Sequence, residues 1–361
     1  MQLGIVGLAR SGKTTVFNAV TRGHARTGSF GHGVEPNVGT VKVPDHRLDR
    51  LAALFKPKKV THADITYLDF PGGFSREGAP PQLLASLARA DALVAVIRAF
   101  EDDTVPHPLG SVDPARDIAA LNLELAFADA AFLEKRLERL DTAVRSMRAG
   151  EREAAERELA LLRRMKADLE REIPIRAQQL TPEDRRLLSS YQFLTDKPLL
   201  IVLNLGERDL PRASEIEAEY RERFGGPGVG VTALSGKLEA ELAELPPEEA
   251  AEFARDLGVT ESGLDRMVRL SYELVGLISF FTVGPDECRA WTVRRGTPAQ
   301  QAAGKIHSDM ERGFIRAEVV RWDELLADGS LAEARKRGHL RQEGKQYIVQ
   351  DGDVMHVLFN V

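Results

Sequence analysis

Cysteine and long apolar runs are both scarce in this 361-residue chain, and each scarcity excludes a class of protein. Cys288 is the single cysteine, so no disulfide can form within the chain. No run of apolar residues comes near the roughly 20 that a membrane-spanning helix needs. The N-terminus also lacks the basic and then apolar segment of a secretory signal. We therefore expect a cytoplasmic protein that has no membrane partner.

Excess positive charge is absent as well, since the formal net charge is −6. A chain with net negative charge has no generic electrostatic attraction to nucleic acid, so we expect no DNA partner. Two local basic runs, residues 163–166 and 335–341, are the candidates for contact with RNA. For each run we favour a solvated helix face or loop over an RNA site.

A phosphate-binding loop stands near the N-terminus, where residues 7–14 match the pattern G-x-x-x-x-G-K-[ST]. The apolar residues 3–6 before it predict a buried strand, and residues 15–20 after it predict a helix. The glycines allow backbone N–H groups to surround a triphosphate. We expect Lys13 to reach the β- and γ-phosphates and the Thr14 hydroxyl to bind Mg²⁺.

Three further apolar runs, at residues 65–69, 92–98 and 199–204, predict strands that are buried along their whole length. Continuous apolar strands are typical of a parallel sheet that helices cover on both faces. Together with the phosphate-binding loop, they predict an α/β fold, a P-loop NTPase (G) domain made of residues 1–121 and 191–277.

A helical insertion is predicted at residues 122–190. This segment predicts an antiparallel helical hairpin with coiled-coil character, and Gly150 is its expected turn. We expect the apolar stripe to be the hairpin's own seam rather than a partner site. The stripe has spacings of three and four and consists of Leu133, Leu137, Leu140, Val144 and Met147, then Leu162, Met165, Leu169 and Ile173.

The last segment, residues 278–361, predicts a small α+β domain. Trp291 and Trp322 are expected to be packing residues within it. Strands are expected at residues 278–282, 290–293, 317–321, 346–350 and 354–360, with a helix at residues 299–306.

Polar motifs follow the expected strands in the order of a GTPase-like nucleotide site. Residues 69–72 match D-x-x-G, in which the carboxylate holds Mg²⁺ through water and the glycine N–H binds the γ-phosphate. Residues 204–207 stand where a base-reading N-K-x-D motif normally lies, and residues 235–237 resemble the S-A-K element on the other side of the base. The predicted metal ligands are Thr14 and Asp69. The residues predicted to bind ATP or GTP are Gly7, Ala9, Arg10, Ser11, Gly12, Lys13, Thr14, Thr15, Gly72, Asn204, Leu205, Glu207, Ser235 and Gly236.

Further matches to a known family lie at residues 35–39, 43–48, 100–103, 237–245, 289–293, 313–319 and 347–356. Through these residues the chain resembles the YchF/Obg-like ATPase family over essentially its whole length. The resemblance implies a P-loop NTPase that associates with the ribosome, regulates translation or a stress response, binds ATP as well as or better than GTP, and hydrolyses it slowly. It also implies that residues 278–361 form a TGS domain, which is a ubiquitin-like β-grasp.

The chain departs from the family pattern around the phosphates. Residues 9–11 read Ala-Arg-Ser where the family has Pro-Asn-Val, and Gly33 stands where the family has a threonine of its first switch. The second switch, within residues 69–91, contains no histidine. In some relatives the asparagine at the position of Arg10 helps to bind K⁺. Arg10 could supply that charge itself, which makes it a candidate catalytic residue beside Lys13, while a side chain that points to solvent stays the alternative.

Two functions stay open at this point, a slow ATP/GTPase switch on the ribosome and a regulator that binds nucleotide with little hydrolysis. A metabolic kinase is disfavoured by the elements at Asn204 and Ser235. Adenine should be accepted at least as well as guanine. Glu207 is one methylene longer than the aspartate that reads guanine, and Leu205 replaces the lysine that covers the base.

Overall fold

The computed structural model describes residues 1–23, 25, 35–70, 73–74, 79–256 and 262–360. They fold as two compact units, one made of Met1–Thr40 with Thr66–Met267 and the other of Val41–Ile65 with Val268–Val361. Residues 41–65, which the sequence analysis assigned to the nucleotide-binding domain, therefore fold with the C-terminal segment.

The first unit is built on a six-stranded sheet with the order β2-β4-β1-β5-β6-β7. The pairs β1–β4, β1–β5, β5–β6 and β6–β7 are parallel, as the continuous apolar runs predicted. One sheet face packs on helices α3, α4 and α7 around a core that includes Leu87, Leu121 and Tyr220. The strands are β1 (Gln2–Val6), β2 (Asn37–Lys42), β4 (Asp64–Asp69), β5 (Ala92–Ala99), β6 (Leu199–Leu205) and β7 (Val229–Leu234).

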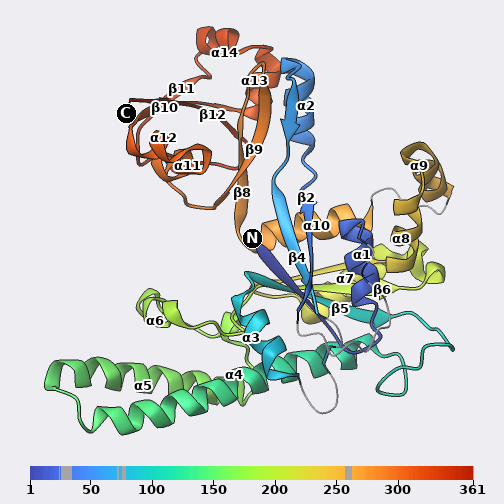
Figure 1. Cartoon of the computed structure of the whole chain (residues 1–361), viewed down its shortest axis with the longest axis vertical. Helices are drawn as coiled ribbons and strands as arrows, with labels where there is room; N and C mark the ends of the chain where they lie inside the picture. Colours follow the sequence, from blue (N-terminus) through green and yellow to red (C-terminus); the bar gives the residue numbers. More distant parts are fainter. Residues whose placement is uncertain (24, 26–34, 71–72, 75–78, 257–261, 361) are drawn as a thin grey trace. The chain divides into compact units, whose positions relative to one another are not determined.

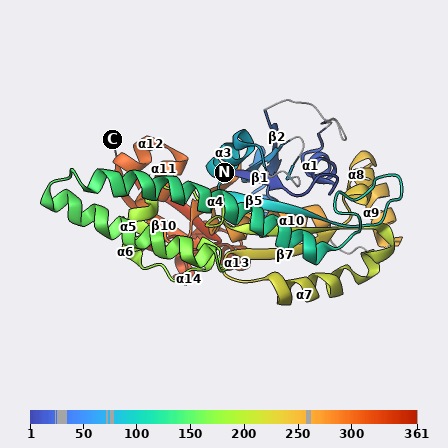
Figure 2. The same cartoon turned by 90° about the horizontal axis from the view of Figure 1, so that it is seen from below.

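Two long helices, α4 (Pro114–Val144) and α5 (Ala149–Leu169), form the predicted hairpin and lie side by side (Figures 1 and 2). All but one of the predicted stripe residues are buried or packed in one apolar cluster between them, whereas Ile173 is 37% exposed. The prediction of the turn at Gly150 was wrong, because that residue lies in the first turn of α5.

The first helix of the hairpin also begins earlier than residue 122. Ile118, Leu121 and Leu125 of α4 pack on the sheet of the first unit, and Leu133 and Leu140 farther along pack on α5. One continuous helix therefore serves both the sheet and the hairpin.

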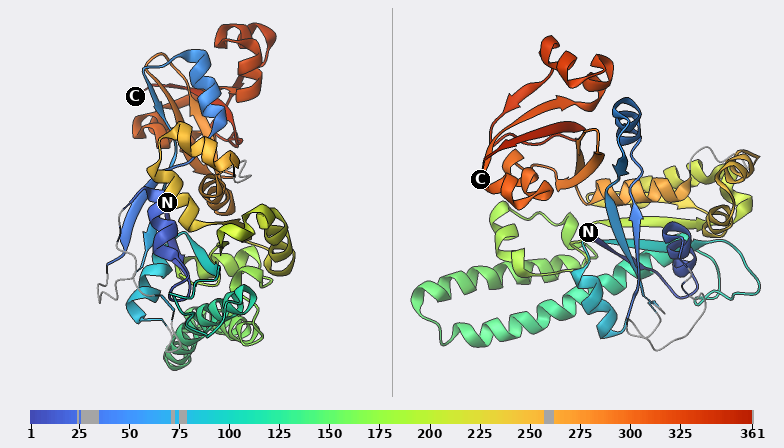
Figure 3. Two further views of the ribbon diagram at one scale, coloured as in Figure 1. Left: turned by 90° about the vertical axis from the view of Figure 1, so that its right-hand side faces the viewer. Right: turned by 45° about the horizontal axis from the view of Figure 1, so that its top comes forward.

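The second unit has a six-stranded sheet with the order β11-β10-β12-β8-β9-β3. Strands β12 and β8 are parallel at its centre, and antiparallel partners flank them. With helix α11 (Ala299–Ile306) packed on one face, this is the ubiquitin-like β-grasp arrangement (Figure 3). The strands are β3 (Lys59–Thr61), β8 (Leu277–Thr282), β9 (Glu287–Arg294), β10 (Phe314–Arg321), β11 (Arg341–Glu343) and β12 (Asp353–Phe359).

The prediction of a strand at residues 346–350 was wrong. The strand in that region is β11, and Ile348 makes an isolated bridge to Pro298. The segment turns instead around Asp353, whose Oδ2 accepts from the Tyr347 hydroxyl and the Gln350 N–H, both at 2.8 Å.

The remaining helices connect these strands, and among the described helices no segment is both long and apolar enough to cross a membrane. They are α1 (Lys13–Thr21), α2 (His46–Phe55), α3 (Pro81–Arg89), α6 (Pro182–Leu187), α7 (Ala213–Phe224), α8 (Gly236–Glu244), α9 (Pro247–Asp256), α10 (Gly263–Leu274), α12 (Ser308–Arg312), α13 (Trp322–Asp328) and α14 (Leu331–Arg337), with 3₁₀ turns η1 (Ile175–Ala177), η2 (Leu188–Ser190) and η3 (Glu207–Arg212).

An ion-pair clip ties α2 to the C-terminal sheet within the second unit. Asp45 caps α2 and accepts from the Arg47 guanidinium, whose Nη1 also donates to Asp351 Oδ2 at 2.8 Å. Asp351 Oδ1 in turn accepts from the Ser279 N–H at 2.9 Å. These carboxylates raise the pKa of Arg47 against the effect of its burial. The motif at residues 43–48 therefore holds residues 41–65 to the second unit.

Candidate nucleotide-binding site

The carboxyl ends of the central parallel strands of the first unit meet at one sheet edge, where ligands bind in folds of this type. The loops after these strands line a cavity of about 1510 Å³. The predicted site residues that line it are Ala9, Arg10, Gly12, Lys13, Thr14, Thr15, Asn204, Leu205, Glu207 and Ser235. The structure thus brings most of the residues that were predicted to bind nucleotide together around one cavity.

The phosphate-binding loop needs glycine at two positions. Gly7 has φ +150°, and a Cβ there would lie 2.4 Å from the Val96 carbonyl oxygen. Gly12 has φ +91°, and a Cβ there would lie 2.2 Å from Asn204 Nδ2. Both contacts are too close for any side chain, so the loop turns tightly against two strands. Gly7 and the buried Ser11 shape this loop without lining the cavity.

Lys13 begins α1 and is 6% exposed. Its Nζ donates to the Leu8 carbonyl oxygen at 2.9 Å, which holds the ammonium over the loop. Burial lowers the pKa of Lys13 from 10.5 to about 8, and attraction to the Asp69 carboxylate opposes that shift. A polyphosphate would supply the negative charge that this buried ammonium lacks.

Thr14 and Asp69, the predicted metal ligands, are in contact. Thr14 Oγ1 donates to Asp69 Oδ2 at 3.0 Å, and Asn37 Nδ2 donates to the same oxygen at 3.1 Å. Asp69 is fully buried, and its Oδ1 has no hydrogen-bond partner among the described residues. A hydroxyl that donates its proton to a carboxylate keeps its lone pairs for a cation. This donor set, with one carboxylate oxygen left over, fits an oxygen-preferring divalent cation.

Asn204 joins two loops of the site. Its Nδ2 donates to the Ser11 carbonyl oxygen at 3.0 Å, and its Oδ1 accepts from the Gly236 N–H at 2.9 Å. Ser235 caps α8 beside it and is 2% exposed. Both ends of the Asn204 amide are therefore used to hold the phosphate-binding loop against the turn before α8.

The side chains of the predicted base-reading residues differ in whether they are free to contact a base. Glu207 lies at the cavity wall, and its Oε1 accepts from Lys237 Nζ at 2.9 Å in an exposed ion pair. This pairing raises the pKa of Lys237. Leu205 is 3% exposed and packs in the sheet core, so its side chain is committed to the fold.

Arg10 has a positive φ of 64°, and its Nη1 donates to the Pro106 carbonyl oxygen at 3.0 Å. The side chain thus reaches from the phosphate-binding loop across to the segment after β5 and lines the cavity. Its predicted role at the phosphates stays a prediction.

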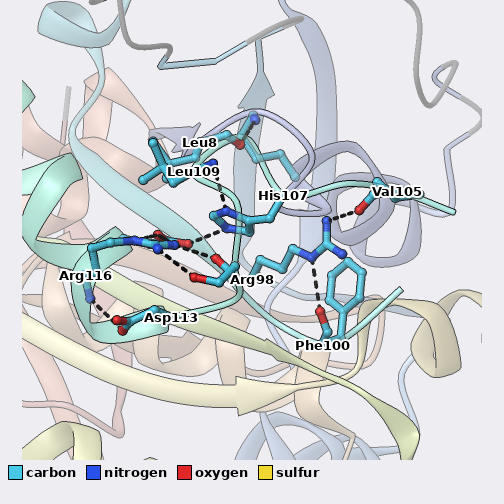
Figure 4. A network of polar contacts seen from close by, with 11 residues as sticks. Leu8, Arg98, Phe100, Val105, His107, Leu109, Asp113 and Arg116 are labelled. Atoms are coloured by element: carbon cyan, nitrogen blue, oxygen red, sulfur yellow. Dashed lines mark hydrogen bonds and ion pairs between the residues drawn. The ribbon is translucent and has the colours of Figure 1, made fainter. Parts of the chain in front are cut away.

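A wall of the cavity that the sequence analysis missed is the segment 100–106 after β5. Arg98 is 2% exposed, and its side chain lies between Phe100 and Val105 of this wall (Figure 4). Its guanidinium donates to the carbonyl oxygens of Phe100 at 3.1 Å, Val105 at 2.7 Å and Asp102 at 3.3 Å. The Arg98 guanidinium carbon also lies 4.5 Å from the centre of the Phe100 ring. The position of the segment after a central parallel strand is the signal that could have identified it.

The same wall is tied to the start of α4 (Figure 4). His107 Nδ1 accepts from the Leu109 N–H at 3.1 Å, so Nε2 is the nitrogen that donates to Asp117 Oδ2 at 2.8 Å. Arg116 and Asp113 complete the turn, since Asp113 Oδ1 accepts from the Arg116 N–H at 3.0 Å. The cavity wall and the long hairpin helix are therefore connected by hydrogen bonds.

Parts of both predicted switches lie outside the described residues, including Gly72 and Gly33. After Gly72, the described Gly73 and Phe74 return to the phosphate-binding loop. Phe74 is 1% exposed, forms a bridge with Leu8 and packs in the core.

The two basic runs are neutralised by neighbouring carboxylates, which favours the solvated faces that we expected over RNA sites. Each arginine and lysine in the runs has an ion-pair partner, and the histidine of the second run contacts a carboxylate. The pairs are Arg163–Asp141, Arg164–Asp184, Lys166–Glu134, Arg335–Glu318, Lys336–Glu333, Arg337–Asp328, His339–Asp328 and Arg341–Glu343.

The fold and the site define a P-loop nucleotide-binding protein of the GTPase-like class. The phosphate-binding loop lies between β1 and α1, D-x-x-G follows β4, and the polar elements after β6 and β7 meet at the loop through Asn204.

Comparison with known proteins places the chain more narrowly. Residues 277–360 match the family model described as "YchF-GTPase_C: Protein of unknown function (DUF933)". The ribosome-binding ATPase YchF of Bacillus subtilis is 42% identical over 365 residues, with 99% of both chains covered. Obg-like ATPase 1 of Oryza sativa subsp. japonica is 36% identical over 371 residues, which cover 100% of this chain and 92% of that one. The structure of the Schizosaccharomyces pombe YchF GTPase has a TM-score of 0.86 at 32% identity and covers 99% of this chain and 97% of that one. The chain belongs to the YchF family.

Proposed function

We propose that this protein is a slow, Mg²⁺-dependent nucleoside triphosphatase that accepts ATP and acts on the ribosome. The observation that carries the proposal is the contact between Thr14 and Asp69 beside the buried Lys13, at the end of a cavity that the base loops line. These groups are the ones that P-loop enzymes use to bind a metal–triphosphate.

Each residue has a defined task in this proposal. Thr14 and Asp69 would hold Mg²⁺, which neutralises charge on the phosphate oxygens when it is bound. Lys13 would stabilise the charge on the β- and γ-phosphates, and the loop N–H groups would position the chain of phosphates. Hydrolysis is favoured over a purely binding role because relatives that match the chain over 99% of its length are named ATPases.

Hydrolysis should be slow because the residues after D-x-x-G cannot orient a water molecule. Many GTPases use a glutamine there, whereas this chain has Gly73 and the buried Phe74. We expect single-turnover hydrolysis by the isolated protein below about 1 per second. A faster rate would contradict this part of the proposal.

Adenine should be accepted at least as well as guanine. A guanine-selective site needs a carboxylate that is free to accept two base N–H groups, and Glu207 is longer than that aspartate and is paired with Lys237. Competition titrations with ATP and GTP test this expectation. A preference for GTP above about 100-fold would require an intact polar readout and so would refute it.

Action on the ribosome is proposed from the relatives. The Bacillus subtilis and Haemophilus influenzae relatives are both named ribosome-binding ATPases, and each is covered over 99% of its length. Binding to ribosomes would place this protein in the cytoplasm. Since the two basic runs are paired internally, we expect contact with the ribosome to depend on other surfaces.

The decisive experiment is calorimetric titration of a non-hydrolysable ATP analogue with Mg²⁺. Lys13→Ala should lower the affinity at least tenfold, or about 1.4 kcal/mol, because it removes the cation that the loop fixes on the phosphates. Lys166→Ala, which removes a lysine of the hairpin that pairs with Glu134, is the control and should bind normally. Unchanged binding by Lys13→Ala would exclude the proposed site. Hydrolysis measured with and without ribosomes then tests the partner.

A further inference from the structure

Asn37 is the unassigned polar group at the predicted metal site. It is the first residue of β2, the strand next to β4 in the sheet, and it lines the cavity. Its Nδ2 donates to Asp69 Oδ2 at 3.1 Å, the oxygen that also accepts from Thr14 Oγ1 at 3.0 Å. Neither the motif at residues 69–72 nor the phosphate-binding loop predicts this contact.

The two hydrogen bonds make the two oxygens of the Asp69 carboxylate different. Asp69 Oδ2 accepts both donors, whereas Oδ1 is buried and has no partner among the described residues. A carboxylate held by two donors on one oxygen cannot rotate freely about its χ2 bond. The other oxygen is thereby presented for a further interaction, and its burial makes an unmet interaction costly.

We infer that Asn37 is a positioning residue for the divalent cation, an inference that rests on the proposed function. It would hold the Asp69 carboxylate through Oδ2 and so leave Oδ1 free to interact with the ion. The amide of Asn37 donates to the buried carboxylate without adding charge to the site. An aspartate at position 37 would instead place a second negative charge about as far away as the present 3.1 Å contact.

The alternative is that Asn37 only fastens β2 to its neighbour β4. The strand offers a matched control for that role, because Thr40 Oγ1 lies 3.2 Å from Thr66 Oγ1 on β4. Thr40→Val removes a side-chain link between the same two strands and does not touch the cavity.

The test measures metal dependence rather than turnover. A fluorescent, non-hydrolysable ATP analogue is held at fixed concentration while Mg²⁺ is titrated, and an ADP analogue is titrated separately in EDTA. We expect Asn37→Ala to raise the Mg²⁺ concentration at half-maximal binding by about 10- to 100-fold, the usual effect of losing a group that orients a metal ligand. Metal-free ADP binding should change less than about twofold, and Thr40→Val should match the unmutated protein in both assays.

A second variant keeps the inference testable even if Asn37→Ala binds nucleotide too weakly to measure. Asn37→Asp puts two carboxylates together, so the metal-free variant should have a lower Tm than the unmutated protein. Mn²⁺ without nucleotide should then raise the Tm of the variant more than the Tm of the unmutated protein. An unchanged Mg²⁺ midpoint in Asn37→Ala, or an equal loss with and without metal, would overturn the inference. Absence of any Mg²⁺-dependent binding by the unmutated protein would instead overturn the proposed function, and this inference with it.

Discussion

Lys13 makes nucleotide affinity depend on pH in a predictable direction. In the nucleotide-free protein, burial lowers the pKa of this ammonium to about 8. Phosphate oxygens favour the charged form, so bound nucleotide raises the pKa again, and binding above pH 8 must take up a proton. The affinity should therefore fall as the pH rises through 8.

The size of the effect follows from the protonated fraction. With a pKa of about 8, Lys13 is about three-quarters protonated at pH 7.5 and about one-tenth protonated at pH 9. The apparent affinity should thus fall about eightfold between these values. The stability of the nucleotide-free protein should rise from about pH 8 to 10.5, because the unfolded chain then binds this proton more tightly than the folded one.

The assay is a titration of a fluorescent ADP analogue at pH 7.5, 8.0, 8.5 and 9.0 in one mixed buffer of constant ionic strength. Lys13→Ala should bind weakly with little dependence on pH, and Lys166→Ala should keep the full slope. An equal affinity at pH 7.5 and 9 in the unmutated protein would refute the argument. So would the same slope in Lys13→Ala, since another group would then carry the proton.

Three further variants test other contacts. Arg98→Lys keeps the positive charge but loses the planar guanidinium that donates to three carbonyl oxygens of the cavity wall. Nucleotide affinity should therefore fall about tenfold in the same titration. An unchanged affinity would contradict this role of Arg98. Arg47→Ala removes the ion-pair partner of Asp45 and Asp351, and the arginine side chain is only 17% exposed. Urea unfolding should therefore show a free energy of unfolding that is lower by about 2–3 kcal/mol. A decrease of less than about 0.5 kcal/mol would mean that the clip is not needed for stability. If Arg10 supplies positive charge at the phosphates, hydrolysis should be equal in Na⁺ and K⁺ buffers and lower in Arg10→Asn. Stimulation of the unmutated protein by K⁺, or full activity of Arg10→Asn, would remove this role.

The parts of the fold that could be predicted are those with strong local patterns. The buried strands β5 and β6 are continuous apolar runs, and the seam of α4 and α5 is a regular stripe, so both were identified from the sequence. The prediction of a turn at Gly150 was wrong because glycine is tolerated in the first turn of a helix, where this residue lies. Residues 41–65 belong to the second unit through contacts between distant parts of the chain, namely the pairing of β3 with β9 and the ion pair of Arg47 with Asp351. No local pattern in the sequence indicates such contacts.

The site also has parts that a local sequence pattern predicts and parts that it does not. Loops with this glycine-rich pattern bind phosphate through their backbone N–H groups, so the motif alone predicts the contacts that we expect. Asn37 acts through Asp69 of β4, a neighbour that the strand order brings close, and its place within residues 35–39 does not predict that contact. Arg98 instead binds carbonyl oxygens of the segment that follows its own strand. The rule that ligands bind at the carboxyl ends of parallel strands would have pointed to the segment after β5. It would not have pointed to Asn37, which stands at the start of its strand.

Asn204 shows how a motif residue can line the cavity while its contacts differ from those that the motif suggests. The sequence placed it beside the base, but its amide donates to the Ser11 carbonyl oxygen and accepts from the Gly236 N–H. An amide has one donor end and one acceptor end, so it can satisfy a carbonyl and an N–H on two different loops at once, which neither aspartate nor leucine can do. The choice of asparagine here therefore follows from joining the phosphate loop to the turn before α8. Because both ends of this amide are used, we expect recognition of the base to depend on other groups, among them Glu207 and the wall that Arg98 holds.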